Sequence, residues 1–329
     1  MKKKNLLKKI SIFAFAVLAF AFTSCATNTK VATASQTVKS EKPSKVKKAT
    51  LSKEDSRFFW RIDGTDKKGK PSTIYVQGTI HVGDQRLKPY SDLVTNAFKN
   101  ADRVYGEIST DDYTRLENMT TQYVLDSYKE GRNLYDYLTD EEINILKELF
   151  TEEGMEQYLA FEPWVIESIL TSAIYMASGL DSNLSVDLYF ENENIAMGRK
   201  TQGLDTLKTQ LDVMRFGDYD CQLYQLKESL GEYPFVETLE SLYEMYEYYL
   251  ADDRESLGEA FNDDYDDFSN EYEEKYYEEI IIKRNQNWAK TFKKLLDEGG
   301  STFVFAGSAH FLGEDSVFEF LKKDGLLDF

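Results

Sequence analysis

Two histidines are the residues of this sequence best suited to chemistry, and they are the only two in the chain. His81 lies three residues after Gly78, and His310 lies three residues after Gly307. In each case an apolar segment typical of a buried strand comes before the glycine. Glycine allows a sharp turn and a close backbone approach where a chain leaves a sheet. The spacing therefore predicts that both imidazoles project into the crevice beyond the strand ends, where ligands bind in open α/β sheets.

A carboxylate near these histidines would complete a metal site. Neutral imidazole is the commonest metal-ligating side chain, and Glu107 lies at the C-terminal end of the predicted strand 103–108. Two imidazoles and one carboxylate leave positions on a divalent ion open for water and substrate. We therefore predict that His81, Glu107 and His310 hold a metal ion. The alternative is that these residues have only structural roles. A histidine at a strand end often only hydrogen-bonds within the fold, and Glu107 could be a surface carboxylate or a helix cap.

The elements that position these residues alternate between strand and helix at both ends of the chain. Residues 58–64 and 72–77 have the pattern of strands, apolar residues recur at helical spacing over 87–98, and the strand 103–108 follows. This order predicts a parallel crossover. Near the other end, residues 301–306 read as a short buried strand and residues 311–323 as a closing helix, with Asp315 or Ser316 near its cap.

Both ends therefore repeat one unit of strand, Gly-x-x-His and helix. Because each unit is too small to stand alone, we predict one α/β domain over residues 57–329 whose central sheet holds both units. Residues 111–296, approximately, are helical in pattern, acidic and rich in Tyr. We expect them to form a large helical insertion, with residues 199–202 as one short strand.

The residues before this domain predict export and membrane attachment. A basic run over residues 1–9 precedes an apolar stretch over 10–22, which is shorter than the roughly 20 residues of a bilayer-spanning helix. This order predicts a signal peptide over residues 1–24 and lipidation of Cys25, and an ordinary signal peptide cut near Ala26 is the alternative. Residues 25–56 are predicted to be a flexible tether. The protein is thus expected to be an exported, membrane-anchored lipoprotein, periplasmic or on the outer face of the cell envelope.

Charge and cysteine content exclude two classes of protein. The formal net charge of −19 becomes −24 without residues 1–24, which carry five Lys and no acid. Phosphate backbones would be repelled, so nucleic acid is not an expected partner. Cys221 is the only other cysteine, so acylation of Cys25 would leave no pair for an internal disulfide.

Two blocks of the sequence resemble the TraB/GumN family, which includes the Tiki-like proteins. The first block is Phe59-Trp60-Arg61-Ile62 with residues 74–83, and the second is residues 284–289 with residues 303–317. Family members carry paired Gly-x-x-His motifs, a glutamate after the first crossover, and an Arg-Asn or Arg-Asp pair. The matching residues here are His81, His310, Glu107, Arg284 and Asn285. Where many relatives have Gly-Leu-Glu-Thr, residues 203–206 have a shortened carboxylate, Asp205.

This resemblance implies a metal-dependent hydrolase related to the animal Tiki proteases, which are described as dependent on manganese or cobalt. It also implies a relation to erythromycin esterases and haem-binding ChaN-like proteins, so the fold does not determine one reaction. We expect a peptidase-like enzyme that acts at the cell envelope on a peptide or other small-molecule substrate. Its metal ion would be manganese or cobalt, although ligand chemistry alone ranks zinc at least as high.

Two alternatives remain within this interpretation. Arg284 is expected to steady a carboxylate or a developing oxyanion, but it could instead only pair with the acidic insertion. The protein as a whole could be a binding protein without turnover that captures a peptide or a haem-like ligand in the same crevice.

Overall fold

The computed structural model describes residues 48–150, 152–230, 234–262 and 270–328. The predicted signal peptide, Cys25 and most of the predicted tether lie outside these residues. The strands are β1 (Ala49–Lys53), β2 (Phe59–Thr65), β3 (Pro71–Thr79), β4 (Arg103–Gly106), β5 (Gln202–Gly203), β6 (Gly300–Gly307) and β7 (Leu327–Asp328).

Helices and short helical turns connect these strands. They are η2 (Gln85–Leu87), α3 (Asp92–Asn100), α4 (Thr110–Tyr113), α5 (Leu116–Asp126), η3 (Leu134–Tyr137), α6 (Asp140–Leu149), α7 (Glu152–Glu156), α8 (Pro163–Ser178), η4 (Ser182–Leu184), α9 (Val186–Ala196), α10 (Leu207–Met214), α11 (Tyr219–Ser229), α12 (Pro234–Leu250), α13 (Arg254–Asn262), α14 (Glu271–Tyr277), the π-helical turn η5 (Glu278–Ile282), α15 (Lys283–Glu298), η6 (Ser308–Phe311) and α16 (Val317–Lys323). Among the described residues, no helix is both long enough and apolar enough to cross a membrane.

One mixed sheet organises the fold, with the strand order β5-β4-β6-β3-β2-β1-β7. The strands β3, β6, β4 and β5 run parallel, whereas β2 is antiparallel to both β1 and β3. The predicted α/β fold, with a central sheet and a helical insertion, is confirmed. The strand β6, from the C-terminal end of the chain, lies between β3 and β4. Consequently, the three strands that precede His81, Glu107 and His310 are neighbours.

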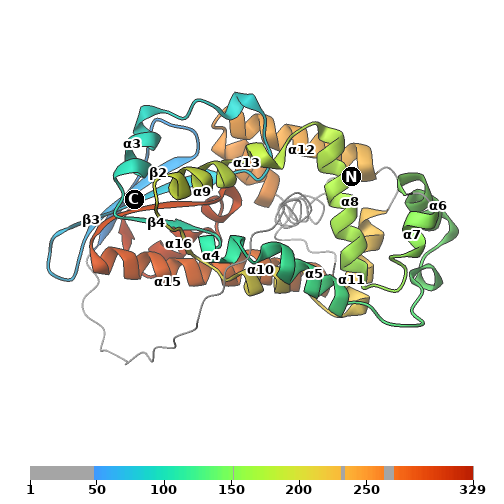
Figure 1. Cartoon of the computed structure of the whole chain (residues 1–329). Helices are drawn as coiled ribbons and strands as arrows, with labels where there is room; N and C mark the ends of the chain where they lie inside the picture. Colours follow the sequence, from blue (N-terminus) through green and yellow to red (C-terminus); the bar gives the residue numbers. More distant parts are fainter. Residues whose placement is uncertain (1–47, 151, 231–233, 263–269, 329) are drawn as a thin grey trace.

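Helices cover both faces of this sheet (Figure 1). The helices α15 and α16 lie on one face, and α3 and α9 lie on the other. The last six residues of the central strand β6 are buried, which explains its apolar run from Phe303 to Ala306. The ring of Phe303 in β6 lies 5.2 Å from the ring of Phe98 in α3 and 5.0 Å from that of Phe190 in α9. These aromatic contacts join the sheet to its helical layer.

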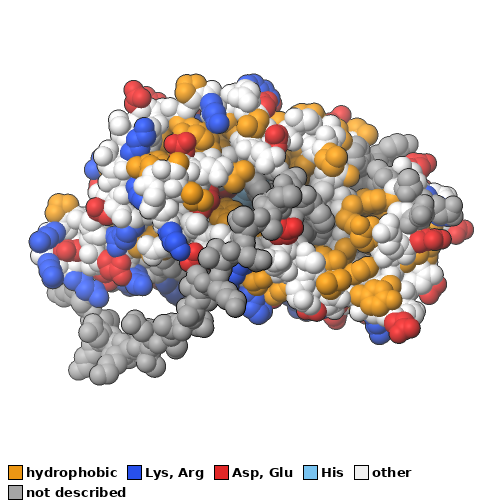
Figure 2. Space-filling model, viewed as in Figure 1, with side chains coloured by type: hydrophobic (Ala, Val, Ile, Leu, Met, Phe, Trp, Pro, Cys, Tyr) orange, Lys and Arg blue, Asp and Glu red, His pale blue; other side chains and the backbone are white. Residues whose placement is uncertain are grey.

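The helical insertion has apolar clusters of its own. One is formed around Trp164, Leu207 and Leu211, and another around Leu134 and Ile166. On the face drawn in Figure 2, hydrophobic side chains gather over the insertion, and Lys and Arg side chains gather over the sheet end of the molecule. The insertion is therefore a packed layer in its own right beside the sheet.

One strand lies earlier in the chain than the sequence indicated. Ala49–Lys53, within the predicted tether 25–56, form β1, which pairs antiparallel with β2 and parallel with β7. No local pattern could reveal this strand, because the pairing partners that stabilise it include the far end of the chain. The predicted strand 103–108 ends at Gly106. The predicted strand 199–202 overlaps β5 only at Gln202, because β5 consists of Gln202–Gly203. The predicted helix 311–323 begins too early: Phe311 is the last residue of η6, and α16 starts at Val317 with Ser316 as its cap.

Candidate active site

His81, Glu107 and His310 come together at one edge of the sheet. Each lies within three residues of the C-terminal end of β3, β4 or β6, and parallel neighbours end at the same edge. His81 Nε2 lies 4.0 Å from Glu107 Oε1. A Cβ atom built on Gly307 would lie 3.1 Å from Glu107 Oε1, 3.6 Å from His310 Cδ2 and 3.8 Å from His81 Nε2. The three side chains thus surround one small space beside Gly307.

Asp187, in the first turn of α9, orients His81. The Nδ1–H group of His81 donates to Asp187 Oδ2 over 2.9 Å, and the hydroxyl of Thr79 donates to Asp187 Oδ1 over 2.6 Å. Because a carboxylate only accepts, Nδ1 carries the proton, and Nε2 faces Glu107. Burial by itself would lower the pKa of His81, but the charge and hydrogen bond of Asp187 and the charge of Glu107 raise it to about 9. The surroundings of His81 therefore favour a positive charge.

Asn285, on α15, orients His310 in a similar way. Its Nδ2 group donates to the carbonyl oxygen of Asp315 over 2.6 Å, so its Oδ1 faces His310 Nδ1, at 2.6 Å. The proton of the neutral imidazole therefore lies on Nδ1, and Nε2 carries the lone pair. Burial and the charge of Arg284 hold the pKa of His310 well below its usual range. His310 is consequently neutral near pH 7.

Arg284 joins two buried carboxylates. Its Nη2 group donates to Glu107 Oε2 over 2.6 Å, and its Nε group donates to Asp205 Oδ2 over 2.8 Å. Burial would raise the pKa of Glu107, but the positive charges of Arg284 and His81 lower it on balance. Burial raises the pKa of Asp205 despite the neighbouring guanidinium. Arg284 therefore positions Glu107 through one donor. Through the other donor it also pairs with the acidic insertion, to which Asp205 belongs.

Two further groups fix the carboxylate of Glu107. The backbone N–H of Gly307 donates to Glu107 Oε1 over 2.8 Å, and Gln210 Nε2 donates to Glu107 Oε2 over 2.9 Å. Each carboxylate oxygen has two lone-pair sites, so these bonds still leave Glu107 able to accept further partners. The carboxylate is therefore held in one place without being saturated.

A cavity of about 20 Å³ lies directly beside these side chains. This volume accommodates about one water molecule, and it is too small for a peptide. The side chains of His81 and Glu107 are only 14% and 11% exposed. A substrate can therefore reach them only if part of the cavity wall moves. That wall consists of Ile108, Tyr113, Leu116, Asp187 and Gln210.

The donor set is of the kind that binds divalent first-row metal ions. Histidine ligands of metals commonly donate their other N–H group to a carboxylate or carbonyl, as His81 and His310 do here. In the part of the chain that the structure describes, however, no group of three or more His, Cys, Asp and Glu side chains is arranged to hold an ion as it stands. Two ligands of a tetrahedral ion lie about 3.4 Å apart, given bonds of roughly 2.1 Å. His81 and Glu107, at 4.0 Å, would need to draw slightly closer.

Sequence reasoning did not identify Asp187 or Gln210. Asp187 is one of 58 acidic residues and lies in the first turn of a helix, where acidic residues are common for local electrostatic reasons. Nothing in the sequence near either residue signals its contact with the site. Asn285 was identified only through the resemblance to a family.

Comparisons with known proteins agree with that resemblance. A sequence model described as the TraB/PrgY/gumN family matches residues 58–327. An uncharacterized protein of Treponema pallidum is 30% identical over 283 residues, which cover 82% of each chain. A protein of Danio rerio named metalloprotease TIKI1 is 24% identical over 331 residues, which cover 86% of this chain and 65% of that protein. No solved structure matches.

Proposed function

The chain belongs to the TraB/PrgY/gumN family, and from this premise we propose that it is a metal-dependent hydrolase that cleaves peptide or amide bonds at the cell envelope. The observation that carries this proposal is the convergence of two imidazoles and one carboxylate beyond three adjacent parallel strands. The similarity to metalloprotease TIKI1 supports a peptide as the substrate. Lipidation of Cys25 would hold the enzyme at a membrane surface.

In this proposal His81, Glu107 and His310 hold the ion. A bound divalent ion lowers the pKa of a water molecule and polarises the carbonyl group of the scissile bond. Asp187 and Asn285 accept from Nδ1 of the two imidazoles, which leaves Nε2 of each neutral ring as the nitrogen with the lone pair. Such outer hydrogen bonds restrict the rotation of each ring, so binding of an ion would require only a small approach of His81 and Glu107.

The charge balance of the site supports a bound cation. Three carboxylates, those of Glu107, Asp187 and Asp205, lie near a single guanidinium, that of Arg284. Buried charges are costly unless they are compensated. A divalent cation would compensate this excess of carboxylates, and in its absence a proton on His81 does so in part.

The small cavity supports hydrolysis rather than transfer to a large acceptor. It offers space for about one water molecule beside His81 and Glu107. A peptide would enter by displacing the wall that Tyr113 and Leu116 form. Because these residues lie on α4 and at the start of α5, we expect movement at this corner of the insertion to accompany substrate binding.

A metal-exchange experiment tests the proposal. The protein is stripped with a chelator, single metals are returned, and bound metal and cleavage of a peptide library are measured. We expect manganese or cobalt to restore cleavage better than magnesium, because nitrogen ligands favour later first-row ions. His81→Ala and His310→Ala should each abolish stoichiometric metal binding and cleavage. Glu162→Gln is the control, because Glu162 pairs with Arg215 and not with Arg284. It should change neither metal binding nor cleavage.

Two results would contradict the proposal. If the protein retains no stoichiometric metal under any condition, or if both histidine variants leave the metal content unchanged, there is no metal centre at these residues. Saturable ligand capture with no cleavage of any peptide would favour the alternative of a binding protein. Circular dichroism of each variant separates loss of the site from loss of the fold.

A further inference from the structure

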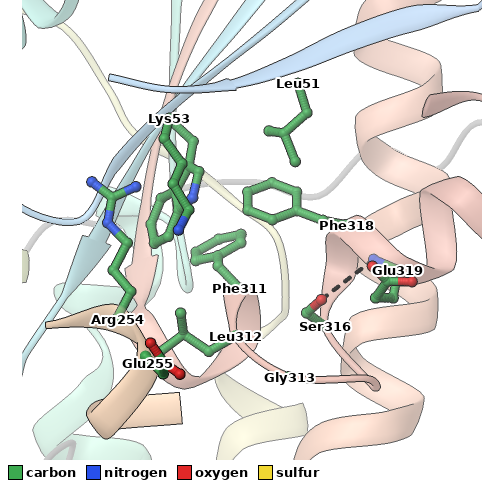
Figure 3. Close-up of a pocket in the computed structure, with 11 residues that line it drawn as sticks. Leu51, Lys53, Arg254, Glu255, Phe311, Leu312, Gly313, Ser316, Phe318 and Glu319 are labelled. Carbon is green, nitrogen blue, oxygen red and sulfur yellow. Dashed lines mark hydrogen bonds between the residues drawn. The ribbon is translucent and has the colours of Figure 1, made fainter. Parts of the chain in front are cut away.

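A second pocket, of about 470 Å³, lies between β1 and α16, away from the residues of the candidate active site. Its volume falls within the range of roughly 300–1,000 Å³ that is typical of small-molecule sites. Phe311, the neighbour of His310 in η6, is part of its wall (Figure 3). The pocket is lined by Leu51, Lys53, Trp60, Arg254, Glu255, Phe311, Leu312, Gly313, Ser316, Phe318 and Glu319.

Three aromatic side chains form the apolar part of this pocket. The ring of Trp60 lies 5.9 Å from that of Phe311 and 5.5 Å from that of Phe318, and the last two rings are 5.3 Å apart. All three side chains are almost completely buried. These packed rings are already ordered in the free protein. An apolar ligand would therefore bind them with little loss of side-chain entropy.

Arg254 has one hydrogen-bond donor that no residue described by the structure accepts. Its guanidinium lies over the ring of Trp60, at 4.5 Å, and only 8% of the residue is exposed. Its Nε and Nη2 groups donate to Asp252, and Nη2 also donates to the carbonyl oxygen of Ser56. Nη1 has no hydrogen-bond partner among the described residues. Buried donors are rarely left unsatisfied, so a water molecule or a ligand atom is the acceptor expected here.

The backbone that holds Arg254 is strained at two places. Asp252 has φ = 55° and Phe58 has φ = 45°, although neither residue is glycine. The backbone N–H of Phe58 donates to Asp252 Oδ1 over 2.6 Å, so the two strained residues are joined to each other and to Arg254. Left-handed conformations of such residues persist where the surrounding structure imposes them, and they are concentrated at functional sites.

Lys53 places a second cation at this pocket. In Figure 3, Lys53 and Arg254 lie along one side, Leu51 and Phe318 lie on the opposite side, and Phe311 lies between them. Lys53 is exposed and has no ion pair with any residue that the structure describes.

Two carboxylates, those of Glu255 and Glu319, also line the pocket. Glu319 lies 3.5 Å from Lys322, and Figure 3 places it on the side opposite Lys53. Arg254 is paired with Asp252, so Lys53 is the cation that makes its side of the aromatic wall complementary to a negatively charged group.

We propose that this pocket binds an apolar ligand that carries one carboxylate group. Its apolar body would pack against Trp60, Phe311 and Phe318, and its carboxylate would accept hydrogen bonds from Lys53 and Arg254. Both the hydrophobic C-terminus of a peptide and a medium-chain fatty acid have this chemistry. The inference is independent of the proposed hydrolase function, because it involves neither a metal ion nor His81 and His310.

Calorimetric titration of the chelator-treated full chain tests this proposal. Two acids are each compared with the matching amide. The first pair is N-acetyl-leucyl-phenylalanine and its C-terminal amide, and the second pair is decanoate and decanamide. We expect at least one acid to bind saturably, and its matched amide to bind about fivefold more weakly or worse. Lys53→Met keeps the apolar stem but removes the charge, so it should weaken binding of the acid about fivefold and leave the amide unchanged.

Three further variants complete the design. Lys99→Met, a matched change of an exposed lysine on α3, should leave the affinity of both probes unchanged. Leu312→Trp should fill the pocket and abolish binding of acid and amide alike. His81→Ala should bind the acid as the unmodified chain does, which separates this pocket from the candidate active site, because His81 lines the other cavity.

The outcomes divide clearly. Binding of the peptide acid alone identifies a peptide end, binding of decanoate alone identifies a fatty acid, and binding of both supports the shared chemistry. The proposal is overturned if neither acid binds saturably, if acid and amide bind equally, or if Lys99→Met weakens the acid as much as Lys53→Met does. Lys53 is exposed, so its variant tests the proposal even if Leu312→Trp fails to fold.

Discussion

Replacing Gly307 with alanine would test the geometry of the candidate active site with a single methyl group. Gly307 has φ = −48° and ψ = 130°, a region that alanine adopts without strain. The added Cβ would lie 3.1 Å from Glu107 Oε1, 3.6 Å from His310 Cδ2 and 3.8 Å from His81 Nε2. The methyl group would therefore occupy the space that the three side chains share.

The expected effects on stability and on activity differ in size. We expect the free energy of unfolding to change by less than about 1 kcal/mol, because the lower entropy of the unfolded chain offsets one tight contact with Glu107. Metal affinity should fall by about 10- to 100-fold, as it does when the surroundings of metal ligands are disturbed. Cleavage should fall by about 100-fold or more, since a displacement of about 1 Å in a reacting geometry has an effect of that order.

Gly78→Ala is the matched control, because Gly78 occupies the same position relative to His81. There the added Cβ would lie 2.8 Å from Ser308 Oγ, 3.1 Å from Trp60 Cζ3 and 3.2 Å from Phe58 Cβ. Overpacking of this kind should destabilise the fold by about 1–3 kcal/mol. Urea unfolding, metal content and peptide cleavage are measured for both variants. The reasoning is refuted if Gly307→Ala retains full metal affinity and cleavage, or if it loses as much stability as Gly78→Ala.

Three further predictions concern other parts of the chain. Asp187→Asn should lower metal affinity by about 10- to 100-fold with little change in melting temperature, measured by metal titration and circular dichroism, because His81 loses its charged orienting partner; unchanged affinity would contradict this role. Hydrogen bonds from the backbone N–H and the hydroxyl of Ser301 lower the pKa of Asp102, so this carboxylate stabilises the fold above its unfolded pKa of about 4 and loses that effect as the pH falls. Asp102→Ala should therefore be less stable than the unmodified chain at pH 7, by up to about 1 kcal/mol, and the difference in urea unfolding should shrink near pH 3; an equal difference at both pH values would argue against it. Mass spectrometry of the native N-terminus should show acylated Cys25, and a free residue there would exclude the lipoprotein prediction.

Local sequence patterns predict most of the strands near the site but not their order in the sheet. The strands that precede His81, Glu107 and His310 could be predicted, because buried parallel strands have short apolar sequences and helical spacing separates them. That β6 lies between β3 and β4 does not follow from those patterns. Likewise β1 was assigned to the tether, because its pairing with β7 joins two ends of the chain that are nearly 280 residues apart.

The sequence by itself determined which side chains are available for chemistry: two histidines after strand-ending glycines, and a glutamate after the next strand. Only the tertiary structure decided what each of them contacts. Asp187 reaches His81 across 106 residues, and Arg284 reaches Glu107 across 177. The two glycines have the same spacing from a histidine, yet one faces the core and the other the site. Spacing along the chain sets the local turn, whereas a contact depends on how the sheet and the insertion pack, and that packing is a property of the whole fold.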